Sequence, residues 1–167
     1  MAIYFPNSEL TDPCGEGWRI TSNFTGSQNP MTNWERSDDV YGGTNFSGNL
    51  VSQSNGIFSF NTYGWFLLDW NFYSYNNDNV RYIEMALQVS WNNGSNFDQH
   101  VYALGQLSPN SSSNYSQGGS ASGFILGNAN TRFKFRYNAQ NSGLTTYGST
   151  DECGTGFTIY KVASENP

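Results

Sequence analysis

Charged residues and long apolar runs are both scarce in this sequence. Only 12% of the 167 residues are charged, whereas a coiled coil or a charged, disordered tail needs many more. Lys and Arg number 7 against 13 Asp and Glu, and the resulting net charge of −6 leaves few basic side chains to neutralise phosphates. No apolar run approaches the ~20 residues of a membrane span. We therefore expect no nucleic-acid partner and no membrane span.

Histidine and cysteine are also scarce, which excludes most familiar reactive sites. His100 is the only histidine, no Gly-x-Ser-x-Gly nucleophile motif occurs, and nothing resembles a set of metal ligands. The two cysteines, Cys14 and Cys153, lack the spacing of a zinc site. They leave two alternatives open, a disulfide bond between the two ends of the chain or two free thiols. We expect no enzyme, no cofactor, and no catalytic or metal-binding residue.

Clusters of charge in the sequence leave two further alternatives open. Two acidic clusters lie in segments that are expected to be loops. Their carboxylates either act in pairs, as in a hydrolase, or are simply solvated. These residues are Glu35, Asp38, Asp39, Asp151 and Glu152. A basic stripe formed by Arg132, Lys134 and Arg136 either contacts an acidic surface or pairs with neighbouring carboxylates such as Glu84.

Aromatic residues, in contrast, are plentiful at 17%, and they alternate with turns rich in Asn, Ser and Gly. This combination is typical of an all-β chain. Residues 65–73 alternate between two faces, and residues 81–90 form the clearest strand. About eight short strands and no helical period predict an antiparallel two-sheet sandwich. Residues 1–49 are expected to form an extended N-terminal arm and the first strands, and residues 50–167 a single globular domain.

The strand at 65–73 is apolar on both faces near its start. Phe66 and Leu68 point one way, while Trp65 and Leu67 point the other. A second apolar face usually means that a partner covers it. Aromatic residues further along the chain, such as Phe133 and Phe135, either fill the core or form a subunit interface.

Loops that combine aromatic residues with Asn and Asp are candidate saccharide-binding surfaces. Such surfaces bind sugars through ring stacking and hydrogen bonds. The candidate ligand-contact residues are Tyr75, Asn77, Asp78, Trp91 and Tyr115. The Ser-, Asn- and Gly-rich segment 108–120 is expected to be an exposed loop.

The order of several short motifs resembles a known family. A Gly-x-Phe-x-Phe strand at 56–60 is followed by a Gly-aromatic-hydrophobic strand at 64–68 and the long strand at 81–90. A Gly-Phe strand at 123–124 and a closing Gly-Phe-x-Ile strand at 156–159 complete the series. The pattern resembles the jelly roll of tumour necrosis factor and of complement globular heads. The stretch 33–39, followed by that pattern, is also similar to virion proteins of tailed phages of the marine cyanobacterial type.

The resemblance implies a jelly-roll homotrimer without a cofactor. In such trimers each subunit packs an edge against the inner sheet of its neighbour around a three-fold axis. The interface candidates are Trp65, Leu67, Phe133, Phe135, Tyr137 and Tyr160.

The function that this resemblance implies is structural. We expect a virion surface protein, made in the host cytoplasm, that serves as a head decoration, a head fibre or a tail-fibre knob. The arm, residues 1–35, is expected to contact other virion proteins such as the capsid or the fibre base. The alternative is a carbohydrate- or host-receptor-binding module that recognises a host surface glycan, and a hydrolase is the third hypothesis.

Overall fold

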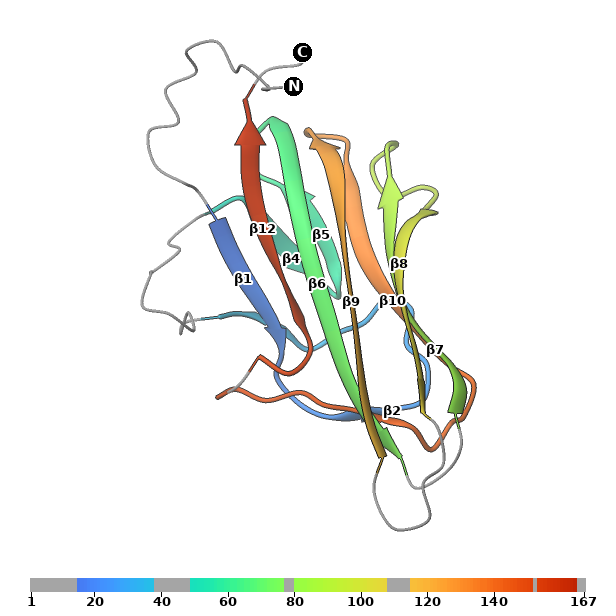
Figure 1. Cartoon of the computed structure of the whole chain (residues 1–167). Helices are drawn as coiled ribbons and strands as arrows, with labels where there is room; N and C mark the ends of the chain where they lie inside the picture. The colour runs from blue at the N-terminus through green and yellow to red at the C-terminus, as the bar shows by residue number, and fades with distance from the viewer. Residues whose placement is uncertain (1–14, 38–48, 77–79, 108–114, 152, 165–167) are drawn as a thin grey trace, which may run out of the picture.

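Two antiparallel β-sheets pack face to face in the computed structural model, which describes residues 15–37, 49–76, 80–107, 115–151 and 153–164 (Figure 1). Within these ranges there are twelve strands and no helix. The strands are β1 (Gly15–Ile20), β2 (Phe24–Thr25), β3 (Trp34–Arg36), β4 (Val51–Ser54), β5 (Ile57–Phe60), β6 (Gly64–Asn76), β7 (Val80–Ser90), β8 (Asp98–Leu107), β9 (Tyr115–Gly127), β10 (Arg132–Ala139), β11 (Thr145–Thr146) and β12 (Gly156–Ala163). The predicted all-β, two-sheet sandwich is confirmed.

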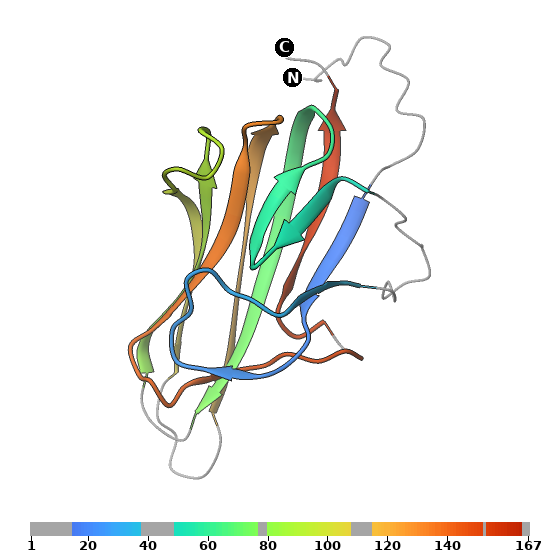
Figure 2. The same ribbon diagram turned by 180° about the vertical axis from the view of Figure 1, so that it is seen from behind.

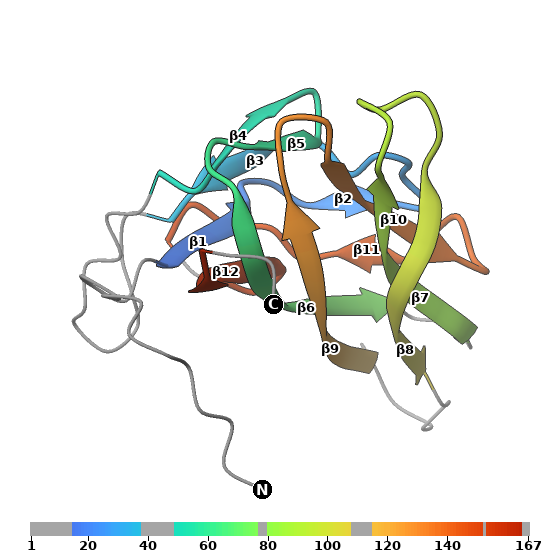
Figure 3. The ribbon, with the colours of Figure 1, turned by 90° about the horizontal axis from the view of Figure 1, so that it is seen from above.

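One sheet has seven strands and the other has five. The seven-stranded sheet has the order β2-β11-β6-β12-β1-β3, and β9 pairs with the other edge of β6. The five-stranded sheet has the order β4-β5-β10-β7-β8. Seen from above, β8 and β9 lie side by side at the edges of the two sheets (Figure 3). Strand β6 is therefore the centre of its sheet, with β12 and β11 on one side and β9 on the other.

Residues 15–36 form three strands of the sandwich, within the range 1–49 that was expected to hold an extended arm and the first strands. Strand β1 pairs with β12 and β3, and the segment after β1 crosses the lower end of the sandwich (Figure 2). Trp18, Met31 and Trp34 from this segment are buried in the core. These strands have two to six residues each and pair with distant parts of the chain. They are therefore too short to show a clear alternation of apolar and polar residues in the sequence. Residues 1–14 lie outside the described residues.

Aromatic rings fill the space between the two sheets. Phe58, Phe133, Phe135 and Phe157 are all buried and in mutual contact. The rings of Phe58 and Phe133 stack with centroids 4.8 Å apart, and Phe58 meets Phe157 edge to face at 5.0 Å. Such contacts stabilise a core beyond the simple burial of apolar area. The core thus accounts for twelve of the 28 aromatic residues.

Strand β9 begins within the segment that was expected to be a loop. Residues 115–120 pair with β6 in register, with Ser120 opposite Asn71. Glycine is required here by close packing, because a Cβ atom at Gly119 would lie 2.6 Å from the Phe72 ring and 2.9 Å from the Leu104 carbonyl oxygen. The Ser- and Gly-rich sequence therefore reflects a close approach of β8, β9 and β6 rather than a loop.

The buried carboxylate of Glu16, near the start of β1, links the seven-stranded sheet to the five-stranded sheet. Glu16 accepts hydrogen bonds from the backbone amides of Leu50, at 2.9 Å, and Val51, at 3.1 Å. It also forms an ion pair with Arg36, with 2.9 Å between Oε1 and Nη2. Burial raises the pKa of Glu16, while Arg36 and the two amides act in the opposite direction. This carboxylate fixes the point where the chain enters the five-stranded sheet.

Candidate functional site

The outer face of the seven-stranded sheet is apolar at one end. Trp65 and Leu67 on β6 point away from the core, because the alternate residues Phe66 and Leu68 are fully buried. The β6–β9 register places Leu126 opposite Trp65 and Phe124 opposite Leu67, and Tyr160 of β12 lies opposite Leu67 on the other side. We call Trp65, Leu67, Phe124, Leu126 and Tyr160 the apolar patch. Phe124 is 56% exposed, which is high for a phenylalanine.

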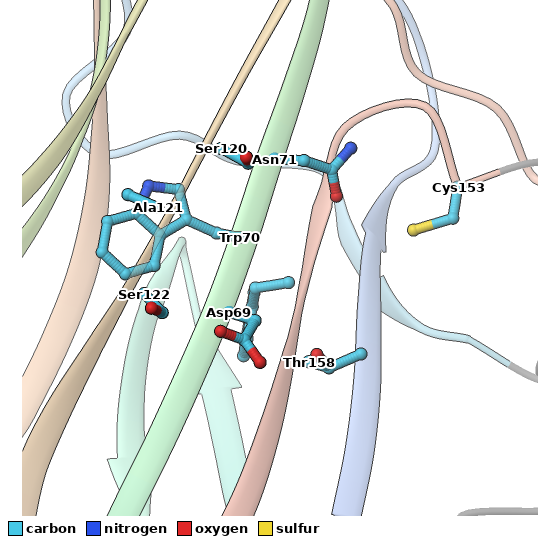
Figure 4. A pocket seen from close by; sticks show the side chains of 9 residues that line it. Asp69, Trp70, Asn71, Ser120, Ala121, Ser122, Cys153 and Thr158 are labelled. Atoms are coloured by element: carbon cyan, nitrogen blue, oxygen red, sulfur yellow. The ribbon is translucent and has the colours of Figure 1, made fainter.

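The same face becomes polar further along β6. Asp69 and Asn71 follow on the outward side and are paired with Ser122 and Ser120 of β9. A shallow depression of about 390 Å³ opens there. It is bordered on the other side by Thr158 of β12 and by Cys153 (Figure 4). A second depression of about 410 Å³ shares Asn71 and Ser120 with the first and extends to Tyr73. We call the two together the polar trough.

The free edge of the five-stranded sheet exposes a second apolar surface. Tyr102 and Leu104 of β8 are 49% and 53% exposed, and both lie on the face of that sheet that points away from the core. We call this pair the edge patch. Close to it, His100 Nε2 lies 2.9 Å from the Phe124 carbonyl oxygen and so joins the edges of the two sheets. The ring nitrogen is the donor here, since a carbonyl oxygen only accepts.

The structure places the six predicted interface residues in two groups. Trp65, Leu67 and Tyr160 are half-buried members of the apolar patch. Phe133, Phe135 and Tyr137 are fully buried within one chain, so they offer no side-chain surface to a second copy. The alternative interpretation, in which strand aromatics fill the core, fits these three. The reason is the register of β10, whose odd-numbered residues face inward.

Tyr137 has a polar role inside the core. Its hydroxyl group lies 2.6 Å from the hydroxyl of Ser74, which is also 3.2 Å from that of Thr146. Burial raises the pKa of Tyr137, although the hydrogen bonds with Ser74 and Thr146 oppose this effect. The three hydroxyls satisfy one another and join β6, β10 and β11.

Three of the five ligand-contact candidates are among the described residues, and Trp91 is separated from Tyr75 and Tyr115 by the length of β7. Trp91 lies in the turn between β7 and β8 and is 50% exposed, as expected of a loop residue. Tyr75 lies in β6 and its hydroxyl accepts a hydrogen bond from Asn23. Tyr115 is the first residue of β9 and not a loop residue. Asn77 and Asp78 lie outside the described residues.

The charged clusters are mostly paired within the chain. Arg136 forms an ion pair with Glu84, as one alternative had it, and Tyr82 donates a hydrogen bond to the same carboxylate. Burial and then Glu84 raise the pKa of Tyr82 to about 12. The Lys134 ammonium lies 4.5 Å from the centre of the Phe97 ring, and burial followed by Arg136 lowers its pKa.

The acidic pairs considered for a hydrolase are not assembled by the described residues. Glu35 forms an ion pair with Arg19 at 2.7 Å, and Asp151 is exposed. Asp38, Asp39 and Glu152 lie outside the described residues. Among the described residues no group of three His, Cys, Asp or Glu could hold a metal ion, and no helix is long and apolar enough to cross a membrane.

Of the two cysteines, Cys153 is among the described residues. Cys153 borders the polar trough with an exposed, free thiol. Cys14 lies outside the described residues, so a disulfide bond and two free thiols both stay open as alternatives.

Sequence reasoning found Trp65 and Leu67 but missed the other exposed apolar residues. Tyr102 and Leu104 lie on either side of the small residue Ala103, which was the available signal, whereas the apolar Ile125 lies between Phe124 and Leu126 and hides the alternation there. The sequence does not say which side of an edge strand faces outward, because that depends on the register between strands.

Comparison with solved structures identifies the fold. The chain is similar to Eiger TNF from S. frugiperda, with a TM-score of 0.68, 9% sequence identity, and 93% of this chain and 97% of that chain covered. Murine APRIL at pH 5.0 matches with a TM-score of 0.64 and 9% identity over 90% of this chain and all of that chain. No protein-family model and no curated protein sequence matches. The chain therefore has a TNF-like jelly-roll fold, and these structural matches support that resemblance in the sequence motifs.

Proposed function

We propose that this chain is a homotrimeric structural protein on the surface of a tailed-phage virion, where it serves as a head decoration, a head fibre or a tail-fibre knob. The observation that supports self-assembly is the presence of two exposed apolar surfaces, the apolar patch and the edge patch, on one chain. Soluble monomers rarely expose such surfaces, and those that do usually bind a protein there.

The positions of the two surfaces favour a ring. The apolar patch lies on the face of one sheet, whereas the edge patch lies at the border of the other sheet. When the edge patch of one copy packs on the apolar patch of the next, every copy uses both surfaces and each contact is the same. Such a head-to-tail contact closes into a ring when the rotation allows it. Three copies correspond to the trimer that the family resemblance implies.

The virion assignment is supported by the sequence rather than by the fold. The stretch 33–39 is similar to virion proteins of tailed phages, and the composition rich in Asn, Ser, Gly and aromatic residues fits phage fibre and decoration proteins. Because residues 15–36 belong to the sandwich, we assign contact with the capsid or fibre base to residues 1–14.

Two experiments test the two parts of this proposal separately. Light scattering after size exclusion should give about 56 kDa, three copies of 18.6 kDa. A monomer at micromolar concentration would overturn the trimer. For the virion assignment, peptides of this chain should be found by mass spectrometry in purified particles, and gold-labelled antibodies should bind those particles. Absence of the chain from purified particles would overturn the virion role, whatever the oligomeric state.

A further inference from the structure

The outward side of strand β6 changes chemistry in mid-strand. The rows at Trp65 and Leu67 are apolar across β9, β6 and β12, and the next row, at Asp69, is polar across the same three strands. The row at Asn71 has Ser120 on β9 and Gly156 on β12. A uniform oligomer interface does not need such a change. The polar trough therefore requires its own explanation, beyond the proposed assembly.

The trough offers hydrogen-bonding groups that the chain does not use. The Asp69 carboxylate is exposed and has no hydrogen bond or ion pair with any described residue. Asn71 donates its Nδ2 to the Gly154 carbonyl oxygen at 2.9 Å, so its Oδ1 is left as an acceptor. Ser120 and Ser122 add hydroxyl groups from β9 (Figure 4). These side chains present acceptors, and hydroxyl groups on a ligand would supply the matching donors, while other lining residues, which include Trp70 and Ala121, are apolar.

An aromatic ring closes one end of the trough. Tyr73 is 40% exposed, and Gly118 stands opposite it on β9, so no side chain covers the ring from that strand. Tyr147 packs edge-on against Tyr73, with the rings perpendicular and their centroids 6.1 Å apart. This contact holds the ring in place and leaves it available for stacking.

We propose that the polar trough binds a neutral oligosaccharide, with the Tyr73 ring stacked on one sugar unit and with Asn71 and Asp69 accepting hydrogen bonds from hydroxyl groups of the sugar units along the trough. Each of the two adjoining depressions falls within the ~300–1,000 Å³ of small-molecule sites. One carboxylate among several uncharged polar groups fits a neutral hydroxyl-rich ligand better than a strongly cationic one. This location differs from the loop surface that the sequence suggested.

The experiment uses defined probes on the intact chain. Maltotriose, cellotriose, mannotriose and triacetylchitotriose are each tested by saturation-transfer NMR, and any that bind are titrated calorimetrically. At least one should bind, and Tyr73→Ala should weaken it at least tenfold and Asp69→Asn at least fivefold. Tyr63→Ala and Asp98→Asn, which alter an exposed tyrosine and an exposed aspartate outside the trough, should leave the affinity within twofold.

The experiment also includes one further protein sample and one further probe. The Trp65→Asp protein is tested beside the native protein, so that a trough covered in the oligomer is still accessible in one sample. Failure of all four probes with both proteins overturns the proposal, as does binding that neither trough variant weakens. Tetralysine is the fifth probe, and binding of tetralysine without any saccharide would show a cationic-ligand site instead. Native mass is measured on the same samples, so failure of the trimer is seen separately.

Discussion

Leu67 and Phe124 stand opposite each other across the β6–β9 ladder, and both side chains point away from the core of the chain that contains them. Cross-strand apolar pairs stabilise a sheet, but these two also leave apolar area in water. Leu67 and Phe124 therefore mark the surface from which the first two predictions follow.

Trp65→Asp should dissociate the oligomer. The change places a charge in the apolar patch, where contact with a second copy would remove it from water. We expect the native mass to fall from about 56 kDa to 18.6 kDa. Tyr63→Asp, in the exposed turn before β6, is the matched control and should leave the mass unchanged. A native mass unaffected by Trp65→Asp would show that the interface lies elsewhere.

If the interface is head-to-tail, mixing two dissociated variants should restore a single contact between the two chains. Leu104→Asp damages only the edge patch and Trp65→Asp only the apolar patch. Each variant alone should be a monomer. A mixture retains an intact apolar patch on the Leu104→Asp chain and an intact edge patch on the Trp65→Asp chain. We expect a heterodimer of about 37 kDa by light scattering, twice 18.6 kDa. A mixture that stays monomeric would argue against a contact between these two surfaces.

Glu16→Ala should lower the free energy of unfolding by at least about 2 kcal/mol. The change leaves the amides of Leu50 and Val51 without acceptors, and each buried donor without a partner costs roughly 1–3 kcal/mol. Urea unfolding followed by tryptophan fluorescence measures the loss. Asp69→Asn, at an exposed carboxylate without a partner, should change the free energy by less than about 0.5 kcal/mol.

The same carboxylate predicts a pH dependence. Because the pKa of Glu16 is raised in the folded state, the folded protein binds this proton more tightly than the unfolded chain does. The corresponding stabilisation is present below the unfolded value of 4.5 and is lost as pH rises through the folded pKa. The native protein should therefore lose stability relative to Glu16→Gln between pH 4 and pH 7. An equal difference at both pH values would contradict a raised pKa.

Gly119→Ala should destabilise the fold by about 1–3 kcal/mol, the usual cost of overpacking a core. The new methyl group would lie 2.6 Å from the buried Phe72 ring, which has no space to retreat into solvent. The measurement is the urea midpoint, with Ser122→Ala on the outward side of the same strand as the control. A midpoint equal to that of the control would mean that β9 can move away from Phe72.

The sequence predicts those parts of the fold whose pattern is local. Strands β6 and β7 were predicted because their inward side chains recur at every second residue. Only the second half of strand β9 was predicted, since Gly119 is required by its contact with the Phe72 ring, a contact between residues distant in sequence. The candidate site, too, could be predicted only where its pattern is local. Asp69 and Asn71 share a face with Trp65 and Leu67 by the alternation predicted over residues 65–73, but Ser120, Ser122 and Thr158 join them only through the register of strands far apart in the chain.

The position of β12 between β1 and β6 has a consequence for synthesis. Because β1 precedes β12 in the chain, the ribosome delivers β1 first, and β1 has no connection to the centre of its sheet until β12 emerges. A chain interrupted before residue 156 would leave one side of β6 unpaired over most of its length. Products that end before β12 would thus lack a finished seven-stranded sheet, and the order of the strands would act as a check that only chains containing β12 enter the proposed assembly.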